Sequence, residues 1–171
     1  LYILFLLLLT ISCNSDKRKL RHLIKTWHGK EIIFTKDFET KISGRDTTFD
    51  LDNSKYKILN YIDTNGCTAC RLKLYEWKLL KDEIDSLRLN VEFLFIAYQE
   101  DYDELEVLIQ ENKVKIPCIY DRNDSINKLN RFPTFLMFQT FLLDSTNHVV
   151  LIGNPTYNEK LWDLYKKNIT Q

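Results

Sequence analysis

The stretch Gly66-Cys67-Thr68-Ala69-Cys70-Arg71 carries two cysteines separated by two residues, and it lies between two regular patterns. The preceding run, Tyr56 to Tyr61, is mostly apolar and is typical of a strand. After the cysteines, apolar residues recur at every third or fourth position, which indicates one face of a helix. The sequence therefore predicts a strand, a CxxC motif, and a long helix that Cys67 opens and that runs to about Leu87.

This arrangement favours thiol chemistry. At the start of a helix, Cys67 faces unpaired backbone N–H groups and the positive end of the helix dipole, which stabilise a thiolate and lower its pKa. Cys70 lies one turn further along, where its thiol can attack a mixed disulfide formed by Cys67. Arg71 and Lys73 add positive charge nearby. The cysteine pair is therefore the candidate redox site.

The rest of the chain alternates between strand and helix patterns. Further strands are expected at Val91–Tyr98, Ile116–Tyr120, Gln139–Leu143 and His148–Ile152, and further helices at Leu20–Trp27, Asp101–Asn112, Asp124–Asn130 and Asn158–Ile169. Two more strands, Glu31–Phe34 and Thr47–Leu51, are expected to flank the turn-forming Ser43-Gly44-Arg45-Asp46. This order predicts an α/β domain: a mixed sheet flanked by helices, with an N-terminal strand pair.

Particular stretches of the chain resemble the thioredoxin superfamily, and especially its TlpA-like periplasmic branch. They are Gly66–Arg71 after a strand, Ile116–Asp121 before a helix, Thr140–Asp144, and Val149–Gly153. The chain is also similar to small thioredoxin-like lipoproteins of Gram-negative bacteria that have no assigned activity. The resemblance extends over about residues 20–169. It implies a thioredoxin-like fold with Cys67 as the nucleophile and Cys70 as the resolving cysteine.

The resemblance also implies where a substrate is held. Thioredoxin-like proteins usually carry a cis-proline just before the strand expected here at Gln139–Leu143, beside the disulfide, where it presents backbone to the substrate. In this register that place falls on Phe138. Pro133 is the alternative, but it would require a strand from Thr134 to Leu143, longer than the usual five or six residues, so we favour Phe138. The implied substrate contacts are Thr68, Ala69, Met137 and Phe138, with Ala69 in a place where the branch often has proline.

The N-terminus resembles a bacterial export signal. Leu1 to Leu9 are all apolar, a run about half as long as a membrane-spanning helix and suited to the core of a signal peptide. Thr10-Ile11-Ser12-Cys13 resembles a lipobox, which implies cleavage before Cys13 and a lipid on that residue. An ordinary secretory signal with an incidental Cys13 is the alternative.

These patterns give the expected organisation and location. We predict a signal peptide at residues 1–12, a lipid-anchored tether at residues 13–19 and a thioredoxin-like domain at residues 20–171. The expected partner is the membrane, through the lipid anchor, and the expected location is the cell envelope, facing the periplasm and on the outer membrane. In such an oxidising compartment a close cysteine pair persists as a disulfide.

Composition restricts the remaining function classes. Lys and Arg number 24 in the 171 residues, as do Asp and Glu, so the net charge is zero, and no nucleic-acid partner is expected. No cofactor and no metal are expected either, because His22, His28 and His148 are scattered singly and give no second pair of ligands with zinc-site spacing. Cys118, in an apolar strand, is expected to be an inert buried thiol.

Two function classes remain open. The first is a thiol–disulfide oxidoreductase that acts on thiols and disulfides of exported proteins. The second is a non-catalytic thioredoxin-fold module in which the Cys67–Cys70 disulfide is structural and the surface binds a partner. The CxxC motif at a helix start favours the first class, whereas Phe138 in the place of the cis-proline favours the second.

Overall fold

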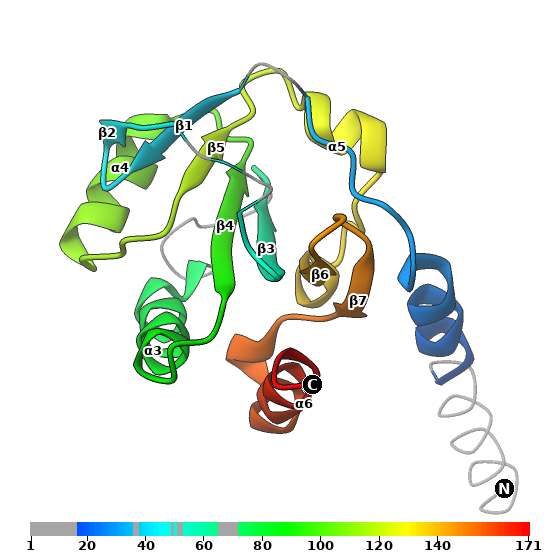
Figure 1. Ribbon diagram of the computed structural model, residues 1–171. Coiled ribbons are helices and arrows are strands. Elements are labelled where there is room, and N and C mark those ends of the chain that lie inside the picture. Colours follow the sequence, from blue (N-terminus) through cyan, green and yellow to red (C-terminus); the bar gives the residue numbers. More distant parts are fainter. Residues whose placement is uncertain (1–16, 36–37, 49, 51–52, 65–71) are drawn as a thin grey trace, which may run out of the picture.

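The computed structural model describes residues 17–35, 38–48, 50, 53–64 and 72–171. These residues form a seven-stranded mixed sheet with helices on both faces (Figure 1). The strands are β1 (Glu39–Ile42), β2 (Arg45–Asp46), β3 (Tyr56–Ile62), β4 (Val91–Ala97), β5 (Cys118–Tyr120), β6 (Thr140–Asp144) and β7 (Val149–Ile152). The helices are α3 (Leu74–Ser86), α4 (Tyr102–Glu111), α5 (Ser125–Asn130) and α6 (Glu159–Ile169), with 3₁₀ turns η1 (Leu136–Phe138) and η2 (Pro155–Tyr157). Residues 17–27 are also helical.

No helix in the described ranges is both long and apolar enough to cross a bilayer.

The strand order is β2-β1-β5-β4-β3-β6-β7, with β3, β4 and β5 parallel and β1, β6 and β7 antiparallel to their neighbours. The central strand β3 pairs with β4 along its whole length and with β6 on its other side. Two buried polar side chains fix the register between β3 and β6, because Thr140 Oγ1 donates a hydrogen bond of 2.7 Å to Asn60 Oδ1. The mixed sheet expected from the alternating pattern is confirmed.

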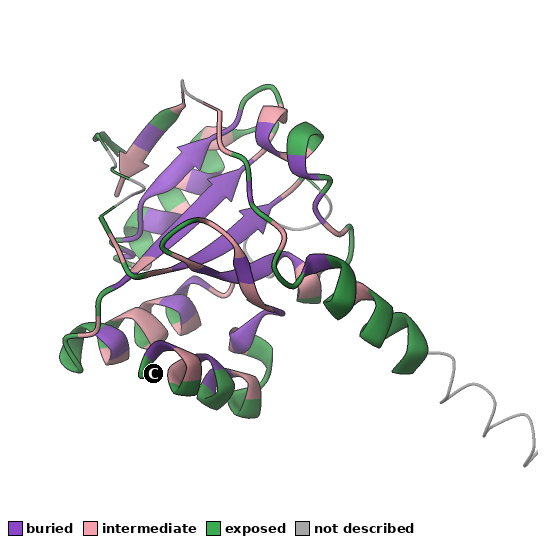
Figure 2. Cartoon of the chain, turned by 45° about the vertical axis from the view of Figure 1, so that its right-hand side comes forward, coloured by how far each residue is buried: buried purple, intermediate pink, exposed green. Residues whose placement is uncertain are grey.

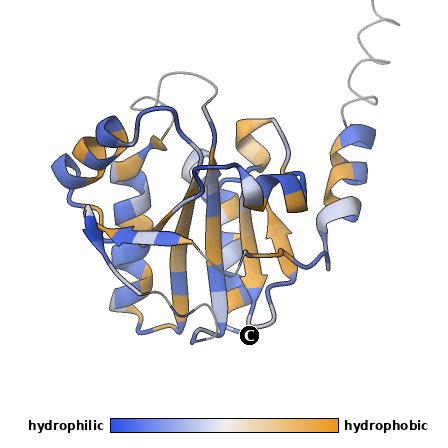
Figure 3. Cartoon of the chain, turned by 90° about the horizontal axis from the view of Figure 1, so that it is seen from above, coloured by the Kyte–Doolittle hydropathy of each residue, from blue (hydrophilic) through white to orange (hydrophobic). Residues whose placement is uncertain are grey.

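Two apolar cores lie on opposite faces of the sheet because side chains alternate along each strand. On one face, Phe93 and Phe95 of β4 pack edge-on against Trp77 of α3, in a core completed by α4 and α6. On the other face, Leu94 and Ile96 belong to a core with residues of α5 and the N-terminal segment. The central strands are accordingly buried and largely hydrophobic (Figures 2 and 3).

The N-terminal strand pair exists, but its expected position is wrong. The two strands are β1 and β2, joined at Ser43 and Gly44, which both have positive φ angles of 51° and 76°. A two-residue hairpin turn of this kind requires such backbone angles. By contrast, Glu31 makes only an isolated bridge to His148, and residues 32–35 are not in a strand.

Both edges of the sheet are occupied by short segments. At one edge lies the two-residue strand β2. At the other edge, the segment after the N-terminal helix bonds to the β6–β7 hairpin: Gly29 N–H donates to the carbonyl of Val149, and Ile32 N–H donates to that of Asn147. The N-terminal segment is thereby held along β7.

Truncating Trp77 should strongly destabilise the fold. Its side chain is almost fully buried between α3 and β4, so Trp77→Ala removes a large apolar volume and leaves a cavity. We expect the free energy of unfolding to fall by about 3–5 kcal/mol, measured by urea denaturation. Tyr75→Ala is the control on the same helix, because Tyr75 is exposed, and it should change stability by less than about 0.5 kcal/mol. Equal losses in the two variants would contradict the assigned core.

Candidate functional site

The predicted redox motif lies outside the described residues. Cys67, Thr68, Ala69 and Cys70 fall in the segment 65–71, and Cys13 falls in the segment 1–16. What the structure does describe is the frame of the motif: the end of β3, the start of α3, and the chain segments packed around them.

Three segments meet at Asp63, the residue that follows β3. Gln139 Nε2 donates a hydrogen bond of 2.8 Å to Asp63 Oδ2, and Gln99 Nε2 donates one of 2.8 Å to the Asp63 carbonyl. In the backbone, Tyr61 N–H donates to the Gln139 carbonyl and Tyr98 N–H to the Ile62 carbonyl. The exit of the chain from β3 is therefore fixed by side chains and backbone from the residues that follow β4 and from the segment before β6.

Gln139 is itself fully buried, and its Oε1 atom has no hydrogen-bond partner in the described part of the chain. An unpaired buried acceptor costs about 1–3 kcal/mol. Such groups are rare in folded proteins. The sequence pattern singles out neither Gln99 nor Gln139 as a site residue. The one available signal was a glutamine at the start of an otherwise apolar strand.

Phe138 lies close to the start of β6, separated from it only by Gln139, whereas Pro133 lies further from this strand. β6 begins at Thr140, whereas residues 134–139 form a bend and the 3₁₀ turn η1. The long strand from Thr134 to Leu143 that Pro133 would require is not formed. Within the described ranges, no peptide bond is cis.

The backbone around Phe138 is engaged within the protein. Phe138 N–H donates to the Phe135 carbonyl at 2.8 Å, and the Met137 carbonyl accepts from Asn154 N–H at 2.8 Å. The exposed groups are side chains: Phe135 is 63% exposed and Met137 is 45% exposed. The Phe135 ring also lies against that of Phe138, with 6.0 Å between ring centroids. This segment therefore offers apolar side chains to the surface.

The start of α3 differs from the expected continuous helix. Lys73 has a positive φ of 45°, in the left-handed region, and the helix proper begins at Leu74. A right-handed helix does not continue through such a residue, so the prediction of one unbroken helix from Cys67 to Leu87 is wrong. The Lys73 ammonium group donates to the Thr156 carbonyl at 3.0 Å and lies 4.0 Å from the centroid of the Tyr157 ring. Lys73 thereby ties the start of α3 to η2.

Cys118 is a free thiol and 1% exposed. Burial, with a smaller effect from the nearby Glu106 carboxylate, raises the pKa of this thiol far above its usual range. A protonated, covered thiol is a poor nucleophile. The expectation that Cys118 is buried and inert agrees with its surroundings.

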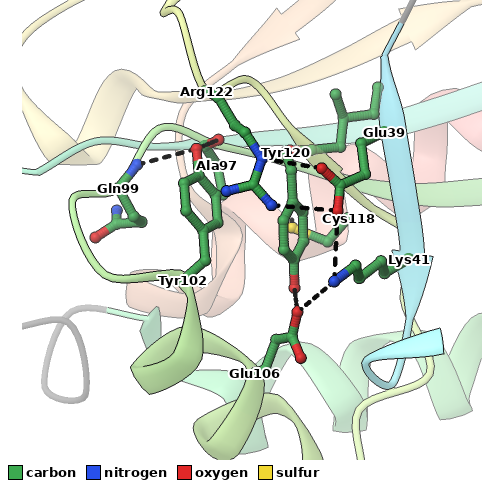
Figure 4. Close-up of polar contacts among 10 residues, drawn as sticks. Glu39, Lys41, Ala97, Gln99, Tyr102, Glu106, Cys118, Tyr120 and Arg122 are labelled. Carbon is green, nitrogen blue, oxygen red and sulfur yellow. Dashed lines mark hydrogen bonds and ion pairs between the residues drawn. The ribbon is translucent and has the colours of Figure 1, made fainter. Parts of the chain in front are cut away.

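A second polar cluster lies around Cys118 and links β1, α4 and β5 (Figure 4). Arg122 makes two hydrogen bonds with the Glu39 carboxylate, of 3.0 and 3.3 Å, and stacks over Tyr102 with 4.8 Å from its guanidinium carbon to the ring centroid. Lys41 Nζ lies 2.7 Å from Glu106 Oε1. A pocket of about 400 Å³ lies beside Glu39 and Arg122. The four charged groups pair with one another, and the cluster holds β1 onto the sheet.

Metal-ligating side chains do not gather in the described part of the molecule. There, no group of three or more His, Cys, Asp or Glu side chains is arranged to hold an ion. His28 Nδ1 lies 3.1 Å from the Val150 carbonyl oxygen, and His148 Nδ1 lies 2.9 Å from Thr146 Oγ1.

Acid should weaken the attachment of β1 through Glu39. Hydrogen bonding to Arg122 is the largest cause that holds the pKa of Glu39 below its usual value. A lowered folded-state pKa means that the stabilisation is complete above about pH 4.3, the unfolded value, and is lost as the pH falls through the folded value. Glu39→Gln should therefore lower the urea midpoint at pH 7, and the difference from the wild type should shrink toward pH 3. Glu111→Gln, at an exposed site on α4, is the control and should show no such pH dependence.

Native Cys118 should resist alkylation. At pH 8, N-ethylmaleimide should label it at least roughly a hundredfold more slowly in the folded protein than in urea, because access requires opening of the core. Peptide mapping by mass spectrometry identifies the labelled site. A thiol introduced by Ser86→Cys, at an exposed position, should react at the same rate under both conditions. Fast labelling of Cys118 in the native protein would refute its burial.

Comparison with known proteins gives a clear result for the fold alone. No family model matches the sequence, and no curated protein matches it. Among solved structures, it is similar to the thioredoxin domain of a thiol-disulfide oxidoreductase from Bacteroides vulgatus, with a TM-score of 0.61 and 14% identity over 83% of this chain and 97% of that one.

Two other solved structures are similar to the same extent. A putative thiol:disulfide interchange protein DsbE from Chlorobium tepidum has a TM-score of 0.62 and 12% identity, over 83% of this chain and 97% of that one. A PrxQ mutant from Xylella fastidiosa has a TM-score of 0.61 and 13% identity, over 82% and 96%. At such identities the likeness concerns the fold, and it confirms the thioredoxin-like architecture expected from the sequence.

Proposed function

We propose that this chain is a thiol–disulfide oxidoreductase that acts on the disulfides of exported proteins through Cys67 and Cys70. The observation that supports the proposal is the position of the CxxC motif in the sequence, between two described elements of a thioredoxin-like fold. Cys67 follows Asp63, the residue after β3, by four residues, and Cys70 precedes Leu74, the first residue of α3, by four. The resemblance in the sequence and the structural neighbours named as oxidoreductases support the same chemistry.

The proposed reaction is a pair of exchange steps. The Cys67 thiolate attacks one sulfur of a substrate disulfide, forms a mixed disulfide, and releases the other substrate sulfur as a thiolate. Cys70, after losing its proton, then attacks Cys67 Sγ, which releases the second substrate thiol and leaves a Cys67–Cys70 disulfide. The substrate gains two electrons and the cysteine pair loses them. The reverse sequence oxidises a substrate dithiol.

We further propose that substrate contacts near Phe138 are made by side chains. The Met137 carbonyl and the Phe138 N–H are already bonded within the protein. The exposed side chains of Phe135 and Met137 supply apolar surface beside the segment that bonds to Asp63. Thr68 and Ala69 remain proposed contacts from the sequence. This arrangement would favour disulfides flanked by apolar residues.

One observation favours the second candidate function, a non-catalytic module. The Phe138 N–H and the Met137 carbonyl already bond within the protein, which disfavours the backbone pairing with an extended substrate that the resemblance implies. A non-catalytic module does not need backbone pairing with a substrate, because its Cys67–Cys70 disulfide is structural and its surface binds the partner. We place the domain in the cell envelope in either case, tethered through a lipid on Cys13, on the strength of the sequence of residues 1–19.

The two candidates are separated by trapping experiments. We expect Cys70→Ser to accumulate mixed disulfides through Cys67, and Cys67→Ser to accumulate few, because the resemblance implies that Cys67 is the nucleophile and Cys70 the resolving cysteine. The wild type should accelerate insulin reduction by dithiothreitol and should have a reduction potential between about −270 and −120 mV. Non-reducing gels, mass spectrometry and a glutathione titration supply these readouts.

Cys118→Ser is the matched control and should keep the wild-type rate of insulin reduction, because Cys118 is buried. A potential below about −300 mV, together with equally little trapping by both variants, would establish the non-catalytic module instead. Rapid consumption of hydrogen peroxide without disulfide exchange would also contradict the proposal, and would align the chain with the peroxiredoxin among its structural neighbours.

A further inference from the structure

The N-terminal helix, residues 17–27, is attached to the domain only at its C-terminal end. Trp27 is buried, with its ring centroid 4.9 Å from that of Phe141 and 6.1 Å from that of Phe132. Next to it, Gly29 N–H bonds to the Val149 carbonyl. Most of the preceding residues are exposed, and the helix extends away from the sheet (Figure 2). The anchored end fixes the direction in which the free part of the helix points.

The exposed part of this helix has a basic face beside an apolar one. Lys17, Arg21 and Lys25 are spaced four residues apart and therefore share one face. None of these three makes an ion pair within the described part of the chain. Residues 17–27 contain no Asp or Glu.

The apolar side chains of the helix extend beyond the part of the helix that packs against the domain. Leu20 and Ile24 lie on the turns before Trp27, at helical spacing, yet they are 42% and 45% exposed. At 100° per residue, Ile24 lies between Leu20 and the face of Lys17 and Arg21. Exposed aliphatic side chains that border a basic face are typical of helices that lie at a membrane surface.

We propose that residues 17–25 form a docking surface for an anionic lipid bilayer, with Lys17, Arg21 and Lys25 on the headgroup phosphates and with Leu20 and Ile24 in the interface. Two features select this occupant. The charge of the face complements anionic headgroups, and the exposed aliphatic side chains of Leu20 and Ile24 border that face, as they do in helices that lie at a membrane surface. The helix then holds the domain in one orientation to the membrane. This proposal is independent of the redox function.

The test compares binding of the full chain to phosphatidylcholine vesicles with binding to vesicles that also contain phosphatidylglycerol. Any anchor at the N-terminus contributes equally to both, so the ratio of the two partition coefficients isolates the effect of lipid charge. We expect the ratio to exceed about ten at low salt and to fall in 0.5 M NaCl, a concentration at which the Debye length is only about 4 Å. Hydrogen exchange should slow in residues 17–27 on the anionic vesicles alone.

Variants then assign the effect to the helix. The triple change Lys17→Gln, Arg21→Gln, Lys25→Gln should lower the partition coefficient on anionic vesicles roughly tenfold to a hundredfold. The matched control changes three other exposed lysines, Lys115, Lys160 and Lys167, to Gln and should leave it within about twofold. Leu20→Ser with Ile24→Ser should weaken binding severalfold, with an unchanged circular dichroism spectrum.

Three outcomes would overturn the proposal. The first is equal binding to neutral and anionic vesicles. The second is an equal loss in both triple variants, which would show a response to net charge alone. The third is hydrogen-exchange protection outside residues 17–27 without protection inside them.

Discussion

Burial of β3 between β4 and β6 is the constraint on which the rest of the structure depends. The strand is paired on both sides and packed on both faces, so its N–H and C=O groups bond to fixed neighbours and its register is not free to slip. It follows that the chain leaves the sheet at one defined point, Asp63, where Gln99 and Gln139 bond to it. The segment that leads toward the cysteines therefore starts from a point that the sheet fixes.

The sequence predicted best the elements whose pattern is set by burial or by capping. β3 and β4 agree with their expected runs to within one residue, because strands buried on both faces read as continuous apolar stretches. α4 and α6 begin where Asp101 and Asn158 cap them through side-chain hydrogen bonds. The strand pair was misplaced because β1 lies near the edge of the sheet and has a mostly polar sequence, whereas the more apolar Glu31–Phe34 segment contributes one bridge.

The candidate site was predictable in part, for similar reasons. The CxxC motif and the place of Phe138 follow from local spacing and from ordinary strand length. The hydrogen bonds that join Asp63 to Gln99 and Gln139 connect residues 36 and 76 positions apart. Contacts of that range leave no periodic signal in a single sequence. The left-handed backbone at Lys73 was equally hidden, because its ties to Thr156 and Tyr157 exist only once η2 is placed beside α3.

The closed edges of the sheet have a consequence for recognition. Proteins with an open edge strand often capture a partner by extending their sheet with the partner's backbone. Among the described strands, β7 is already flanked by the segment around Gly29 and Ile32, and the opposite edge ends in the two exposed, charged residues of β2. These two edges offer no long row of unpaired backbone groups to which an extended peptide, or a second copy of the chain, could add a strand. Among the described residues, recognition of a protein partner through side chains is therefore favoured over extension of the sheet.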